Sequence, residues 1–155
     1  MEIHGLEGVL AEHPFCRGMA EADVALLAGC AANRRYGPGE LLFRAGEEAS
    51  RTWLIRSGRV AFELHDPGQG ARTLETAEDG EIVGWAWLFP AWQHHFDART
   101  LGVVRAIELD GACLRRKCEA DPRFGFELTR RILLQAHRRL ERRRVQGLDL
   151  YGGRP

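Results

Sequence analysis

The sequence predicts a mainly β domain with helices at both ends, and three observations support this fold class. Residues 34–110 read as short strands separated by turn signals, for example the alternating segment 60–64 followed by Asp66-Pro67-Gly68. Residues 9–32 and 111–147 instead show helical spacing of apolar side chains. Several short strands at regular spacing are typical of β-sandwiches, barrels and jelly rolls.

The length and composition predict one globular domain over residues 1–155. The chain has 45% hydrophobic and 28% charged residues, an ordinary globular mixture. No segment approaches the roughly 18 consecutive apolar residues of a membrane span. The N-terminus lacks the basic start and apolar run of a signal peptide, so we expect a cytoplasmic protein that does not bind membranes.

The formal net charge of zero hides two halves of opposite charge. Up to Asp121 there are 13 basic and 19 acidic residues, and from Pro122 onward there are 9 basic and 3 acidic residues, so the balances are −6 and +6. The charge of each segment therefore says more about its contacts than the net charge of the whole chain does. The basic C-terminal part predicts either contact with an acidic protein partner or neutralisation by the acidic body.

The two helical segments have recognisable beginnings. Carboxylates at Glu21 and Asp23 suit the start of a second helix within 9–32. Asp110 is a candidate cap for a short helix that continues to Cys118. Asp121-Pro122 then predicts the start of a long helix that ends near Gly147.

The long helix carries a narrow apolar seam with residues three and four positions apart. This spacing is typical of a helix that pairs with a second helix, and it predicts a homodimer. The seam residues are Phe126, Thr129, Leu133, Ala136 and Leu140. The arginines around the seam are expected to be solvated or to need an acidic neighbour. The four cysteines contain no Cys-x-x-Cys pair, so we expect buried thiols rather than disulfides or metal ligands.

Three motifs resemble the cyclic nucleotide-binding domains of the catabolite-activator type. They are Gly39-Glu40-Leu41-Leu42-Phe43-x-x-Gly46-Glu47, Trp53-Leu54-Ile55-x-x-Gly58-x-Val60 and Gly80-Glu81-Ile82-Val83-Gly84. The resemblance covers roughly residues 9–147. It implies an eight-stranded jelly roll, or double-stranded β-helix, flanked by N-terminal helices and a long C-terminal helix. It also implies a phosphate-binding cassette that is entered through the third motif, with its turn shaped by Gly84 and Ala86.

The cassette departs from the family pattern at its two main ligand positions. In the family, a Glu directly after the cassette Gly holds the ribose, and a later Arg pairs with the cyclic phosphate. Here Trp85 occupies the Glu position, and the Arg position falls on His94 or His95. A hydrogen bond to a charged group is worth about 1.5–3 kcal/mol, so losing both should weaken cyclic AMP binding severely. A protonated histidine could replace part of the Arg charge and would make binding pH-dependent.

Aromatic residues concentrate where the family ligands are lost. They predict either a pocket rebuilt for stacking on a planar ligand or a pocket filled by its own side chains. The residues expected to form the modified site are Gly84, Trp85, Ala86, Trp87, Trp92, His94, His95, Phe96, Asp97 and Arg99.

The sequence therefore predicts a stand-alone sensor that binds a cyclic nucleotide weakly, or another small ligand, and signals through its C-terminal helix. The alternative is a ligand-free scaffold subunit that docks a larger complex, with a redox complex as one candidate. No nucleophile with a neighbouring base and no metal-ligand spacing stands out, so we expect neither enzyme activity nor a metal or other cofactor. The segment after Gly147 is too short for a helix-turn-helix module, so no dedicated DNA binding is expected.

Overall fold

The structure is a computed structural model that describes residues 3–152, with the side chains of residues 5–147. Its helical start consists of α1 (Ile3–Glu12), the 3-10 turn η1 (Pro14–Cys16) and α2 (Glu21–Ala28). The prediction of helix over 9–32 is wrong at both ends. The first helix begins at Ile3, and residues 31 and 32 belong to a strand because Ala31 pairs with Leu109.

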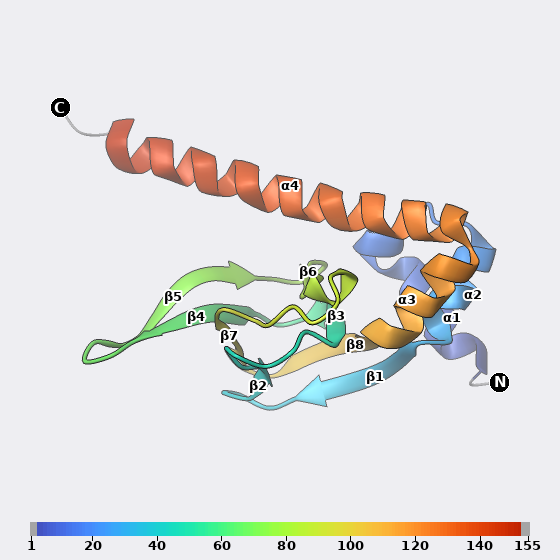
Figure 1. The fold of residues 1–155 in the computed structure, drawn as a ribbon, viewed down its shortest axis with the longest axis horizontal. Helices are drawn as coiled ribbons and strands as arrows, with labels where there is room; N and C mark the ends of the chain where they lie inside the picture. Colours follow the sequence, from blue (N-terminus) through green and yellow to red (C-terminus); the bar gives the residue numbers. More distant parts are fainter. Residues whose placement is uncertain (1–2, 153–155) are drawn as a thin grey trace.

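The β-roll contains eight strands within residues 3–152, in two four-stranded antiparallel sheets. The strand orders are β1-β8-β3-β6 and β2-β7-β4-β5. This arrangement confirms the expected jelly roll with helices at both ends (Figure 1). The strands are β1 (Ala31–Tyr36), β2 (Leu41–Phe43), β3 (Arg51–Ser57), β4 (Val60–Asp66), β5 (Gly70–Ala77), β6 (Ile82–Val83), β7 (Asp97–Thr100) and β8 (Val104–Asp110).

Two apolar clusters hold the fold together. One lies between the two sheets and includes Phe43, Trp53 and Phe62. The other joins the first sheet to the helices and includes Leu27 and Trp87. Burial of apolar surface contributes about 25 cal/mol per Å², so these large side chains dominate the stability of the roll.

Two helices follow the roll. The Asp110 side chain accepts hydrogen bonds from the main-chain N–H groups of Ala112 and Cys113, which confirms it as the cap of α3 (Gly111–Ala120). The last helix, α4 (Pro122–Gly152), begins where the sequence predicts. The expected end near Gly147 is wrong, because α4 continues to Gly152. A single glycine costs about 1 kcal/mol in a helix and does not by itself end one.

The long helix α4 lies across the roll and extends from the N-terminal helices past β6 and β5 (Figure 1). Its first turns bury Phe124, Leu128 and Ile132 in the helix-facing core. Farther along, Arg139 also faces the roll and is only 6% exposed. No helix in the described range is both long and apolar enough to span a membrane.

The cysteines differ from the expectation of four buried thiols. Cys30 and Cys113 form a disulfide, although 83 positions separate them in the sequence. The sheet brings them together, because β1 pairs with β8 and the N–H of Asp110 donates to the carbonyl of Cys30 over 3.0 Å. Sequence spacing alone did not reveal this proximity. Cys16 and Cys118 remain thiols.

Candidate ligand-binding site

The cassette begins with a sharp turn at Gly84. Its φ of +81° is unfavourable for residues with a Cβ, and a Cβ there would lie 3.2 Å from the carbonyl oxygen of Arg51. A short 3-10 turn, η2 (Ala86–Leu88), follows immediately. The chain then returns along residues 46–49, because the carbonyl oxygens of Trp92 and His94 accept from the N–H groups of Ala49 and Gly46 over 2.8 Å. The cassette is therefore fixed at both its start and its end.

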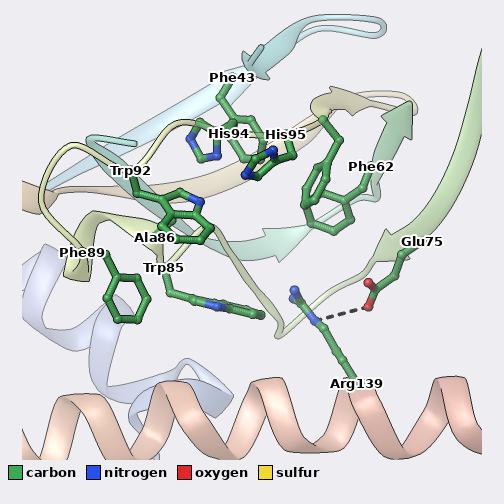
Figure 2. Close-up of a pocket in the computed structure, with 12 residues that line it drawn as sticks. Phe43, Phe62, Glu75, Trp85, Ala86, Phe89, Trp92, His94, His95 and Arg139 are labelled. Atoms are coloured by element: carbon green, nitrogen blue, oxygen red, sulfur yellow. Dashed lines mark ion pairs between the residues drawn. The ribbon is translucent and has the colours of Figure 1, made fainter. Parts of the chain in front are cut away.

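A cavity of about 280 Å³ lies between this cassette, the second sheet and α4. Aromatic side chains form most of its wall, and Figure 2 shows them arranged around a common space. The full lining is Phe43, Phe62, Glu75, Gly84, Trp85, Ala86, Phe89, Trp92, His94, His95, Phe96 and Arg139.

Seven of the ten residues expected at the site line this cavity. They are Gly84, Trp85, Ala86, Trp92, His94, His95 and Phe96. Both His94 and His95 face the cavity. His94 is buried and its ring stacks on Phe43 at 3.6 Å, whereas His95 is exposed and contacts Trp92 edge to face at 5.7 Å.

Three expected site residues do not line the cavity. Trp87 points into the helix-facing core and is fully buried, because η2 turns its side chain toward α3. The Asp97 carboxylate is engaged by the N–H of Ala45 at 2.7 Å and by His65 at 3.0 Å. Arg99 points out of β7, pairs with Glu63 at 3.0 Å and donates to the carbonyl of Gly39. The structure therefore does not bring these three side chains to the cavity.

Five further residues line the cavity that the sequence pattern does not predict. Phe43 and Phe62 look like ordinary core residues in the sequence, and Phe89 lies in the cassette itself. Glu75 belongs to β5 and Arg139 to α4, so only the fold brings them to the cassette. Of the two situations expected for the arginines of the long helix, Arg139 shows the second, because it is buried beside the acidic residues Glu75 and Glu81.

Arg139 connects α4 to the cavity. Its Nε lies 3.4 Å from Glu81 and 4.0 Å from Glu75, and its Nη2 donates to the carbonyl of Ile82. Its guanidinium group also lies over the ring of Trp85 at 5.0 Å and near Phe62 at 5.8 Å. Burial lowers the pKa of Arg139, and the two carboxylates oppose this effect. An arginine remains charged under these conditions.

The neighbouring groups define the charge of the cavity at neutral pH. Burial lowers the pKa of His94, Glu47 opposes this effect, and the adjacent His95 acts in the same direction as burial. The neutral form of His94 therefore predominates at pH 7. Within residues 5–147 no cluster of three His, Cys, Asp or Glu residues is arranged to hold a metal ion.

The apolar seam of α4 lies on the face turned away from the roll. Phe126 is 69% exposed, Leu133 66% and Leu140 47%. Thr129 is also exposed and Ala136 is half-buried. These side chains are available to a partner, and the homodimer remains a prediction.

Comparison with known proteins identifies the family. The cyclic nucleotide-binding domain family matches residues 33–121, and the chain belongs to this family. A CRP-like cAMP-activated global transcriptional regulator of Mycobacterium tuberculosis is 24% identical over 145 residues, which are 94% of this chain and 63% of that protein. The chain spans less than two thirds of the length of the curated relatives it matches. The family match and the fold therefore define a CRP-like cyclic nucleotide-binding domain.

Solved structures share the fold at low sequence identity. One, assigned as a cyclic nucleotide-binding protein of Geobacter metallireducens GS-15, has a TM-score of 0.77 at 20% identity, over 86% of this chain and 97% of that chain. Another is the regulatory subunit of a cAMP-independent protein kinase A from Trypanosoma cruzi bound to guanosine, with a TM-score of 0.62 at 19% identity, over 81% of this chain and 48% of that chain. The M. tuberculosis relative is a transcriptional regulator, and the T. cruzi relative is a regulatory subunit.

Proposed function

We propose that this domain is a sensor that binds a neutral planar ligand in the cassette cavity and transmits binding to α4 through Arg139. The observation that carries the proposal is the aromatic cavity with Arg139 of α4 in its wall. Pockets lined mostly by apolar and aromatic groups with a few polar groups are typical ligand sites.

The polar groups of the cavity favour a neutral ligand over a cyclic phosphate. Trp85 stands at the family's Glu position, and the family's Arg position falls on His94 or His95, of which His94 is held toward its neutral form by burial. The guanidinium group of Arg139 is already engaged by Glu75, Glu81 and the carbonyl of Ile82. The Glu75 carboxylate in the wall would also repel an anion. A nucleobase offers a flat face for stacking and needs no anion site, and the guanosine-bound T. cruzi relative is consistent with this chemistry.

The same contacts provide a route to α4. A planar ligand that stacks on Trp85 competes with the guanidinium group, which lies 5.0 Å from the centre of that ring. Moving Arg139 would weaken its ion pairs with Glu75 on β5 and with Glu81, which directly precedes β6. Ligand binding would thereby change how α4 is held against the roll, as expected for a two-state sensor.

Tryptophan fluorescence tests the binding step, because two tryptophans line the cavity. Guanosine, adenosine, cyclic AMP and cyclic GMP are titrated at pH 8 and pH 6, with thermal shift as a second readout. We expect a nucleoside to quench the fluorescence, with the cyclic nucleotide bound at most about threefold more tightly. The Trp92→Ala variant should bind roughly 5- to 150-fold more weakly, as expected for loss of one stacking platform.

The control is Val103→Ala, an exposed residue outside the cavity, which should leave binding unchanged. Absence of both quenching and thermal shift up to millimolar nucleoside would contradict the proposal. A cyclic nucleotide bound a hundredfold more tightly than its nucleoside would contradict the preference for a neutral ligand.

The exposed seam of α4 favours a second function, in which the domain acts through protein–protein contact rather than through a ligand. Phe126 and Leu133 are each more than half exposed and lie on the face opposite the roll. The seam spacing fits a second copy of this helix, so we propose a homodimer through α4. In a purely docking protein the cavity would not respond to nucleosides.

A further inference from the structure

We propose that the Cys30–Cys113 disulfide is a redox site that reacts with a small anionic thiol of the glutathione class. The two cysteines form part of the wall of a surface cavity of about 710 Å³. Cys30 is 9% exposed and Cys113 is half-buried. A disulfide that faces an open cavity can be reached by a thiol, whereas one inside a core cannot.

The charges around the disulfide favour an anionic reagent. Arg34, Arg51 and Arg116 line the cavity together with Glu108 and Asp110. Glu108 is paired with Arg34 at 3.2 Å and with Arg51 at 2.8 Å, and Asp110 is occupied with capping α3. Arg116 makes no ion pair with any residue between positions 5 and 147. The cavity therefore carries an excess positive charge that attracts carboxylates.

The reaction balances as thiol–disulfide exchange. The thiolate of the first small thiol attacks Sγ of the more exposed Cys113, a mixed disulfide forms, and Cys30 leaves as a thiolate that takes up a proton. A second small thiol attacks the outer sulfur of the mixed disulfide and releases Cys113. The products are two protein thiols and one small-molecule disulfide, so the protein gains the two electrons and two protons that the small thiols lose. Cys113 is in the first turn of α3, where the helix dipole stabilises its thiolate as a leaving group.

The disulfide is connected to the cassette through α3. Arg115 donates to the carbonyl of Trp87, and a Cβ on Gly111 would lie 2.6 Å from the Cβ of Trp87. The N–H of Gly111 also donates to the carbonyl of Ser50 over 2.8 Å. Reduction frees the start of α3 from Cys30, so it should loosen the contacts that position η2. The two remaining cysteines do not take part: burial raises the pKa of the Cys16 thiol to about 12 and also raises the pKa of Cys118.

The test follows the disulfide in the full-length protein by alkylation and peptide mapping, with reduced glutathione and neutral 2-mercaptoethanol as probes. We expect native protein to be reduced by both, and Arg116→Gln to slow the glutathione reaction about two- to fivefold while leaving the 2-mercaptoethanol rate unchanged. Arg72→Gln, an exposed arginine on β5, is the matched control and should change neither rate.

A second measurement tests whether reduction of the disulfide loosens the cassette. Reduction should speed amide exchange in residues 86–88 and 111–116 by about tenfold or more, and Cys113→Ser should reproduce this without added thiol. The reduced wild-type protein gives the same information if the variant does not fold. The proposal is overturned if Cys30 and Cys113 do not pair in the presence of oxidised glutathione. It is also overturned if reduction requires denaturant, or if exchange in these segments is unchanged. None of these outcomes depends on a nucleoside binding to the aromatic cavity.

Discussion

Arg139 differs from the other arginines of α4 because the fold removes it from water. It contacts Glu75 and Glu81 as well as the ring of Trp85, whereas its neighbour Arg138 is exposed. Buried charged groups are tolerated only when they are paired and hydrogen-bonded. The environment of Arg139 satisfies this condition and places a single α4 side chain at the candidate site.

Replacing this side chain should reduce stability. Arg139→Gln leaves Glu81 with Arg142 as its remaining ion-pair partner and loses the contact to Trp85. We expect the free energy of unfolding to fall by about 1.5–3 kcal/mol, the range for hydrogen bonds to charged groups. Urea denaturation measures the change. Arg138→Gln should stay within about 0.5 kcal/mol of wild type, and equal effects for the two variants would contradict the account.

The buried His94 predicts a loss of stability in acid. Its pKa is lowered in the folded protein by burial, so the unfolded chain takes up a proton at a higher pH than the folded chain does. The contribution of neutral His94 to the free energy of unfolding is complete above the ordinary pKa of about 6.5. It is lost as the pH falls through that value toward the lowered pKa of the folded state. The unfolding temperature should therefore fall between pH 7.5 and pH 5.5.

The matched variant for this effect is His94→Phe, which keeps a ring against Phe43 but cannot titrate. Its unfolding temperature should fall less over the same pH range. A residual fall is expected because the buried His13, which contacts the carbonyl of Ile55, also has a lowered pKa. Identical pH profiles for wild type and His94→Phe would contradict this assignment.

Among the structural elements, the cassette depends on its first turn. Gly84 has a positive φ, and an added Cβ would press against the main chain of β3 at Arg51. Gly68 also has a positive φ, but an added Cβ there has no atom within 4 Å. Gly84 therefore positions η2 and the cavity wall, whereas Gly68 serves only a surface hairpin.

This difference gives a paired prediction. Gly84→Ala should destabilise the fold by about 1–2 kcal/mol from the backbone conformation alone and by more because of the contact with β3. Gly68→Ala should show only the conformational cost. Thermal unfolding followed by circular dichroism compares the two, and a smaller loss for Gly84→Ala than for Gly68→Ala would be inconsistent with the cassette geometry.

The exposed seam of α4 predicts the behaviour of that helix in solution. Leu133→Glu places a charge in the centre of the proposed helix pair, so a wild-type dimer should become a monomer in light scattering. Leu101→Glu, on the exposed loop after β7, is the control and should leave the mass unchanged. A Leu133→Glu protein that retains the dimer mass would exclude this face as the interface.

At the scale of the whole molecule, basic residues from Pro122 onward form ion pairs with acidic residues of the part up to Asp121. Arg123 pairs with Asp23 of α2, and Arg142 pairs with Glu81 at 2.9 Å. Arg143 also approaches Glu75 to 3.8 Å. The acidic body therefore neutralises part of the basic helix without a partner. These pairs hold α4 along the roll, where Arg139 reaches the cavity.

The sequence was sufficient for features that depend on local patterns. Strand alternation, turn glycines and the cap at Asp110 predicted the roll and the start of α3. The sequence was not sufficient where distant elements meet: the Cys30–Cys113 disulfide and the approach of Arg139 to Trp85 depend on tertiary packing. The directions of Trp87, Asp97 and Arg99 could not be read from the sequence because a short turn and the register of the inner strand β7 set them, and a shift of one residue reverses the face of a strand.

The most direct test of the central claim is amide hydrogen exchange along α4 with and without saturating guanosine or adenosine, whichever binds. The account predicts that the ligand changes exchange in residues 136–146, which include Arg139 and its neighbours, and leaves residues 122–132 unchanged because Phe124, Leu128 and Ile132 anchor them in the core. A ligand that binds in the cavity without changing exchange in residues 136–146 would contradict transmission through Arg139.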